Sequence, residues 1–310
     1  MTPCNLNSAT EVRQAGWGKY LIMLNSRTIF ALLISFTTGF CVSNEAYSSD
    51  FHSPRTDALG GAGHASPLLG DAIYLNPSFM PFTLTHSLSV DYLLYNGANE
   101  YHGHGLNASV MDGSAESLFQ AGVGYTVRDD STLVHVAAAK QIVSKILSLG
   151  IGAKFIFPKN NPSVSSPSNS SERYVDGTFS ATVLASSWFQ ASAIIDNLFN
   201  AATNLGFYRE YILGTKFNVM GITLLYIDPH MFSDRSLGYE FGGEFPFFSD
   251  FFLRMGGFKN STIPYQAERG DGYGIGVGWI GPKISLDYAF SRAFLPISAL
   301  SHNFSVSIFF

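Results

Sequence analysis

Large apolar residues alternate with small or polar residues along most of the chain from about residue 85 to the C-terminus. The stretches "LFQAGVGYTV" (118–127), "LSLGIGAKFIF" (147–157) and "KISLDYAFS" (283–291) each repeat this pattern with a period of two. Successive side chains of an extended strand point to opposite faces, so this period collects the apolar residues on one face. The pattern predicts strands with one apolar face and one polar face.

About 14 such segments follow one another, separated by turn-like stretches such as "RDDS" (128–131) and "IGPK" (280–283). The polar, low-complexity stretch "PKNNPSVSSPSNSSE" (158–172) is expected to form a mobile external loop. The expected strands lie near residues 86–96, 104–111, 117–128, 131–140, 144–157, 173–185, 187–197, 206–217, 218–228, 236–246, 249–258, 271–280, 283–291 and 302–310.

A transmembrane barrel explains the two faces better than a soluble β-sandwich, which also alternates. The polar faces combine charges with glycines, whereas the opposite faces are almost uniformly large and apolar. A barrel in lipid needs apolar residues outside and polar residues inside, and its closure leaves no backbone group unpaired. Strands of about 9–11 residues also match a tilted membrane crossing. The sequence predicts an all-β fold, a transmembrane antiparallel β-barrel of about 14 strands.

One strand carries a glycine at every second position. In "GYGIGVGW" (272–279), Gly274 and Gly276 belong to a bare face, and the opposite face is large and apolar. Glycine weakens a strand but suits a place where another backbone approaches closely. We expect the bare face to point into the lumen against a packed segment. A wall thinned beside a small-molecule path, or simple strand bending, would also account for it.

The N-terminus resembles an export signal. Arg27 precedes the apolar core "TIFALLISFTTGF" (28–40), which is followed by a smaller, more polar stretch with plausible cleavage after Ser43 or Ala46. We expect residues 1–46 to form a cleaved signal peptide with an over-extended start, and Met23 to be the true start. The alternative is an uncleaved N-terminal anchor helix.

Composition narrows the possible functions. Charged residues make up 13% of the chain and the net charge is −5, so no basic face favours nucleic acid as a partner. The two cysteines are Cys4 and Cys41, both within the expected signal peptide. The predicted mature chain therefore has no disulfide framework, thiolate metal site or cysteine nucleophile.

The last residues, "HNFSVSIFF", form an amphipathic segment that ends on an aromatic residue. Such an ending resembles the C-terminal assembly signal of bacterial outer-membrane barrels, which the barrel-assembly machinery recognises. The resemblance implies that this machinery is a partner, and it places the protein in the outer membrane of a Gram-negative-type envelope. The residues expected to form the signal are Phe304, Val306, Ile308 and Phe310.

Residues 53–82 do not alternate. Their pattern of an Arg, the stretch "ALGGAG", an Asp-Ala pair and Asn-Pro resembles the N-terminal region of FadL-type outer-membrane channels and of the related PorV-type and TraF-like barrels. The final strands are similar too, so the resemblance covers residues 55–77 and 238–310, about a third of the chain. "NPS", where relatives more often have "NPA", is a departure. The residues that match the family's hatch region are Arg55, Gly60, Gly61, Gly63, Asp71, Asn76 and Pro77.

The resemblance implies a domain order and a function. Residues 47–84 would form a hatch inside the lumen of a barrel formed by residues 85–310. The family's function is passive, porin-like uptake of hydrophobic or amphipathic small molecules, which pass the hatch and can leave sideways through the wall into membrane lipid. The alternative is a PorV-like scaffold that anchors a secretion or assembly partner and transports nothing.

Charged residues on the polar faces are the remaining candidates for chemistry. Paired carboxylates can act as acid and base, but in a plugged barrel they more often form a structural polar network or contact a ligand. No catalytic motif and no cofactor site are identified, so an enzyme is not expected. His102 and His104 share a face without identifiable partner ligands, so no metal site is predicted. The candidate lumen residues are Lys154, Glu240, Glu244, Arg254, Gly274, Gly276, Lys283 and Asp287.

Overall fold

The computed structural model describes residues 51–96, 102–114, 117–128, 131–159, 173–203, 207–248, 250–264 and 268–310. The expected signal peptide (1–46) and residues 160–172 of the expected external loop lie outside this described part. The three-domain division of the sequence therefore stays a prediction at its N-terminal end.

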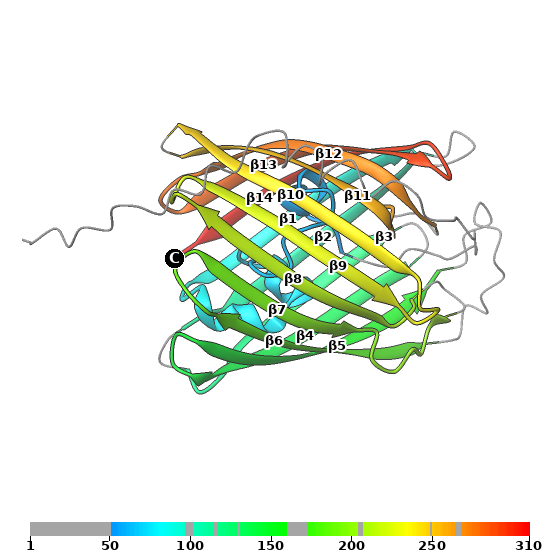
Figure 1. Cartoon of the computed structure of the whole chain (residues 1–310). Helices are drawn as coiled ribbons and strands as arrows, with labels where there is room; N and C mark the ends of the chain where they lie inside the picture. The colour runs from blue at the N-terminus through cyan, green and yellow to red at the C-terminus, as the bar shows by residue number, and fades with distance from the viewer. Residues whose placement is uncertain are drawn as a thin grey trace, which may run out of the picture. The chain divides into compact units, whose positions relative to one another are not determined.

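Fourteen antiparallel strands form a closed barrel, in which β1 pairs with β14 to complete the wall (Figure 1). This confirms the predicted fold class. The strands are β1 (His86–Asn96), β2 (His102–Asp112), β3 (Gln120–Arg128), β4 (Ser131–Val143), β5 (Leu147–Pro158), β6 (Tyr174–Leu184), β7 (Phe189–Asp196), β8 (Glu210–Val219), β9 (Thr223–Phe232), β10 (Leu237–Phe248), β11 (Phe251–Thr262), β12 (Arg269–Ile280), β13 (Ile284–Leu295) and β14 (Ala299–Phe309).

Burial alternates along the strands as the sequence pattern predicts. In β1, each buried residue is followed by an exposed one, and β3 shows the same alternation over most of its length. The exposed positions are mainly large apolar residues, for example Leu88, Val90 and Tyr92 in β1. An apolar exterior and a polar interior are the arrangement that a barrel in lipid requires. Within the described residues, no helix has the length and apolar character needed to cross a membrane.

The turn between β8 and β9 lies further along the chain than predicted. The sequence pattern placed the boundary at 217/218, whereas β8 continues to Val219. Met220 and Gly221 form the turn with φ values of 57° and 71°. Two successive residues with positive φ are typical of tight hairpin turns, and one glycine there reduces the steric cost. The preceding Lys-Phe-Asn does not mark this position by composition.

Residues 51–83, called the N-terminal segment below, contain three short helices: α2 (Pro54–Ala58), α3 (Asp71–Leu75) and the 3₁₀ helix η1 (Pro77–Phe82). Ser53 starts α2 through a capping box, because its side chain accepts from the Thr56 N–H and the Thr56 hydroxyl accepts from the Ser53 N–H at 2.9 Å. Pro54 occupies the first helical position, where its missing N–H costs nothing.

The N-terminal segment lies against the inner face of the wall (Figure 1). Helix α2 contacts β11 to β14, α3 contacts β2 to β4, and η1 contacts β3 to β6. The stretch between α2 and α3 reaches the remaining side, where the Gln190 side chain of β7 donates to the Ala65 carbonyl and the Lys216 Nζ of β8 donates to Ser66 Oγ at 3.1 Å. The segment therefore fills the cross-section of the barrel at its own level.

Wall glycines allow this close packing. A Cβ placed on Gly276 of β12 would lie 2.6 Å from the Ala58 Cβ, and one on Gly242 of β10 would lie 2.6 Å from the Leu59 carbonyl oxygen. The bare face of "GYGIGVGW" thus faces the backbone of α2. Glycine is required here because any side chain would displace a neighbouring segment.

Candidate functional site

The interface between the N-terminal segment and the wall holds buried charges. Arg55 of α2 is buried and reaches two wall strands: its Nε donates to Glu244 Oε2 at 3.1 Å, and its Nη2 donates to the Tyr226 hydroxyl at 2.6 Å. Its third donor, Nη1, reaches the Ser66 carbonyl at 2.8 Å. Burial works against the charge, but Tyr226 and Glu244 outweigh it and raise the pKa of Arg55 above its ordinary value. Arg55 is therefore a charged anchor between segment and wall.

The wall extends this pairing into a row of alternating charges. Glu244 Oε2 also accepts from Arg254 Nε at 2.6 Å, and Arg254 Nη1 donates to Asp287 Oδ1. The row Arg55–Glu244–Arg254–Asp287 spans α2, β10, β11 and β13. Removing one member of a buried ion pair typically costs about 3–5 kcal/mol, because its partner stays buried and uncompensated.

Asp71, at the start of α3, is a buried acid beside this row. Its Oδ2 accepts from Ser53 Oγ at 2.6 Å, which joins the starts of α2 and α3. Burial raises the pKa of Asp71 to about 7, although the Ser53 hydrogen bond and the charge of Arg55 oppose the shift.

The Asn76-Pro77 pair docks the segment on the opposite wall. Asn76 Nδ2 donates to Thr182 Oγ1 and Ser192 Oγ, both at 3.0 Å, and to the His64 carbonyl at 2.8 Å. Pro77 begins η1 beside the small residues of β5, where a Cβ on Gly152 would lie 3.6 Å from its Cγ. The buried amide of Asn76 thus ties two parts of the segment to β6 and β7.

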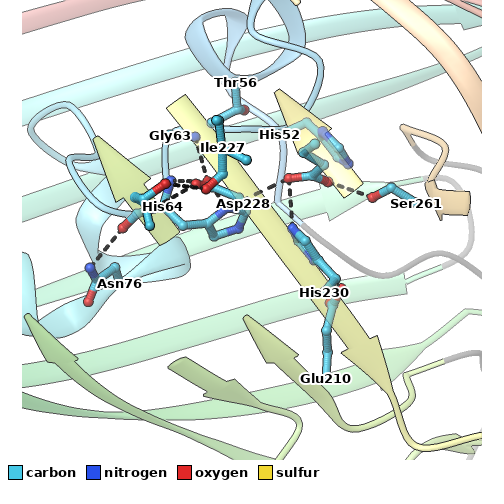
Figure 2. Close-up of polar contacts among 12 residues, drawn as sticks. His52, Thr56, Gly63, His64, Asn76, Glu210, Ile227, Asp228, His230 and Ser261 are labelled. Atoms are coloured by element: carbon cyan, nitrogen blue, oxygen red, sulfur yellow. Dashed lines mark hydrogen bonds and ion pairs between the residues drawn. The ribbon is translucent and has the colours of Figure 1, made fainter. Parts of the chain in front are cut away.

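Two histidines and three carboxylates form a second polar cluster (Figure 2). Asp228 of β9 accepts from the Gly63 N–H at 2.8 Å and the His64 N–H at 2.9 Å, and His64 Nδ1 lies 3.1 Å from the same oxygen. His230, two residues along β9, lies with Nδ1 2.5 Å from Glu210 Oε1 and with Nε2 3.0 Å from Glu240 Oε2. All five side chains are buried.

The cluster borders a small cavity of about 40 Å³. Its lining includes His64, His230, Glu240 and Glu210, with Lys154 also reaching it. A water molecule needs about 10–15 Å³ by this measure, so the cavity holds about three waters. It is too small for an aromatic ring, since a cavity that binds benzene measures about 150 Å³.

The structure brings most of the predicted site residues together. Six of the predicted hatch residues are described above or sit beside the wall in the same way: a Cβ on Gly60 would lie 2.7 Å from the Gly257 Cα, and one on Gly61 would lie 2.8 Å from Glu240 Oε2. Gly63 is held by Asp228. Of the predicted lumen residues, Lys154 is buried and donates to Asp196 Oδ2 at 2.8 Å.

Lys283 is the exception. It lies exposed in the turn between β12 and β13, before β13 begins at Ile284, and does not line the lumen. The alternating pattern assigned it to the inner face by parity, but the turn ends the strand one residue earlier, so the parity no longer applies. On β14, the predicted assembly residues Phe304, Val306 and Ile308 point outward, and Phe310 follows the strand, also exposed.

Sequence reasoning missed His64, Glu210, Asp228 and His230. His64 follows the glycine-rich stretch of the N-terminal segment, and the other three face inward from β8 and β9. Their polar character at inward positions of an alternating strand was a usable signal. Their mutual proximity had no local signal, because Glu210, His230 and His64 lie on separate parts of the chain. His104, considered at the sequence level, lies on the exposed face of β2.

Known structures share this fold. The monoaromatic hydrocarbon channel CymD superposes with a TM-score of 0.62 at 11% identity, over 83% of this chain and 96% of that one. The toluene transporter TbuX of Ralstonia pickettii gives 0.60 at 10% identity, over 83% and 97%. The toluene transporter TodX of Pseudomonas putida gives 0.55 at 12% identity, over 86% and 99%. No protein-family model matches the sequence, and no curated protein matches it.

Proposed function

We propose that this protein is an outer-membrane channel for passive uptake of hydrophobic or amphipathic small molecules, and that its N-terminal segment is the hatch. The fold is that of solved channels for aromatic hydrocarbons, and the apolar exterior suits lipid. The observation that carries the proposal is the N-terminal segment itself, which crosses the lumen and is attached to the wall by a few polar contacts.

The described conformation is the closed one. Arg55 and Asn76 hold the segment from opposite sides, and the cavity of about 40 Å³ beside it cannot admit an aromatic ring. Passage of a small hydrophobic molecule at this level therefore requires the N-terminal segment to move. No catalytic step is part of the proposal.

A reversible crosslink tests whether the segment moves. A Cβ on Gly70 would lie 3.3 Å from the Ser109 Cβ of β2, close to the 3.5–4.5 Å typical of disulfides. Gly70 has a φ of −60°, which any residue adopts. The predicted mature chain has no other cysteine, so the double variant Gly70→Cys/Ser109→Cys can form one intramolecular disulfide.

Uptake of radiolabelled toluene into proteoliposomes is the measurement. Oxidation should block uptake in the double variant, and a reductant should restore it, whereas the Ser109→Cys control should be insensitive to both. Equal uptake by the oxidised and reduced double variant would show that transport bypasses the segment. Absence of uptake by the folded parent protein, with a panel of alkanes, aromatics and fatty acids, would sink the channel proposal.

A scaffold without transport is the second candidate function. The observation that favours it is the dense packing of the segment, with buried ion pairs and backbone against wall glycines. A scaffold would show no uptake in either redox state and would co-purify with a stoichiometric partner from the membrane. A channel would show redox-dependent uptake in vesicles that contain no other protein.

A further inference from the structure

We infer that His64, His230 and Glu240 form a binding site for a divalent transition-metal ion, with Zn²⁺ the best match, inside the barrel. One ligand atom from each residue lies within 4.8 Å of the others, and all three side chains are buried. His64 belongs to the N-terminal segment, His230 to β9 and Glu240 to β10. Neither the fold nor the proposed uptake function calls for a metal at this place.

The distances suit a metal better than they suit hydrogen bonds. His230 Nε2 and Glu240 Oε2 lie 3.0 Å apart, yet both atoms are buried and neither makes a hydrogen bond of ordinary geometry. His64 Nδ1 lies 3.7 Å from the same Glu240 oxygen. Zn–N and Zn–O bonds of about 2.0–2.2 Å at tetrahedral angles separate neighbouring ligand atoms by about 3.3 Å. Small side-chain movements would bring the three atoms to this spacing.

Outer contacts orient each ligand in the way that metal sites require. The other ring nitrogen of His230, Nδ1, faces Glu210 Oε1 at 2.5 Å, which is the carboxylate–histidine–metal arrangement. Ser261 Oγ donates to Glu240 Oε1 at 2.5 Å, so the second oxygen, Oε2, is the one left for a metal. Asp228 fixes the backbone at His64 by accepting its N–H at 2.9 Å.

Charge and space are consistent with a cation. Three buried carboxylates, those of Glu210, Asp228 and Glu240, surround two imidazoles. A divalent ion would offset most of this negative charge. The cavity of about 40 Å³ beside the three ligands has room for a bound water, which would complete a fourth position. Two nitrogen donors and one carboxylate favour zinc over magnesium or calcium, which prefer oxygen ligands.

The site would join the hatch to the wall. One ligand comes from the N-terminal segment and two from the barrel, so a bound ion would hold the segment in place in addition to Arg55 and Asn76. The consequence for gating rests on the proposed function, whereas metal binding itself does not. The binding experiment therefore does not depend on transport.

Metal content of the tag-free, folded mature protein is the measurement. The protein is stripped with a chelator, incubated with Zn²⁺, desalted and analysed by mass spectrometry for metal per chain, and Co²⁺ replaces Zn²⁺ for visible absorption. We expect about one ion per chain in the parent and a Co²⁺ spectrum typical of four or five ligands. Affinity should fall at least about 10-fold in Glu240→Gln and His230→Gln, and about 10–100-fold in Glu210→Gln.

His135→Gln is the matched control, because His135 is also buried, faces inward and lines the same cavity but is outside the ligand set. It should bind as the parent does. Heat-modifiable migration on gels shows that each variant is folded. A folded parent that retains no Zn²⁺ or Co²⁺ would overturn the inference, as would equal binding by the parent, Glu240→Gln and His230→Gln. If the site is confirmed but uptake is absent, the channel proposal fails and the metal site stands.

Discussion

At the scale of single residues, Gly276 and Val277 offer a direct test of the lumen assignment. A Cβ on Gly276 would come within 2.6 Å of the Ala58 Cβ, whereas Val277 is 45% exposed on the outer face. Overpacking a tight interior typically costs about 1–3 kcal/mol, while lipid adapts to shape. We expect Gly276→Leu to lower the stability of the barrel in urea unfolding from lipid vesicles, and to raise leakage of small dyes.

Val277→Leu is the control at nearly the same membrane depth and should be close to neutral. A damaging Val277→Leu with a neutral Gly276→Leu would mean that the two faces are assigned the wrong way round. Parent-like behaviour of both variants would contradict the packing of α2 against β12.

Asp71 gives the hatch region a dependence on pH. Because burial raises its pKa to about 7, the carboxyl stays protonated in the folded state at pH values where the unfolded chain is already ionised. Its contribution to stability is therefore full below about pH 4 and is lost as the pH rises towards 7. A shift of this size corresponds to about 4 kcal/mol. The charged groups around it are Arg55, Arg254, Asp287 and Asp91.

Asp71→Asn keeps an oxygen that can accept from Ser53 but cannot ionise. We expect the free energy of unfolding of this variant to fall less between pH 4 and pH 7 than that of the parent. Other buried acids titrate in both proteins, so the difference between the two profiles isolates Asp71. Superimposable profiles would contradict the assignment.

At the scale of the element, β14 completes the wall and carries the expected assembly signal. It pairs with both β1 and β13, and Phe310 exchanges two backbone hydrogen bonds with His86 at 3.1 and 3.2 Å. Its outward residues are apolar, as the sequence pattern predicts. We expect deletion of Phe310 to reduce the amount of heat-modifiable barrel in the outer membrane, because both the terminal aromatic and these two bonds are lost.

Phe310→Tyr keeps the backbone bonds and an aromatic terminus and should assemble normally. Equal folded yield and location of the deletion variant and the parent would refute the signal, and would leave the barrel itself untouched.

Strand existence was predictable, and strand boundaries less so. β1 begins and ends where the alternation does, at His86 and Asn96. The β8–β9 boundary was wrong by a few residues, because the alternation continues through the turn and only the positive φ values of Met220 and Gly221 mark it. Lys283 was misplaced for the same reason, since parity identifies a face only while the chain is a strand.

At the scale of the whole molecule, export should remove the N-terminal extension. Arg27 and the apolar stretch 28–40 predict cleavage near residue 46, and these residues lie outside the described structure. Intact-mass analysis of protein from the membrane fraction should give a chain that starts close to residue 47. A mass that includes Cys41 would contradict cleavage and favour the anchor helix.

The sequence by itself determined the barrel, its strand number and which face of each strand points inward. These follow from a period of two, which is a local property and is repeated in every strand. It also indicated that the glycine face of β12 meets another segment, because four alternating glycines have few other uses in a wall.

Only the tertiary structure decided which inward groups meet. Arg55 and Glu244 are 189 positions apart, and Asn76 and Ser192 are 116 apart, so no local pattern could pair them. The cluster of His64, His230 and Glu240 forms because the N-terminal segment folds back across the lumen to β9 and β10. Their contact depends on how the strands close and how deep the segment enters, which are properties of the closed barrel and not of any strand alone.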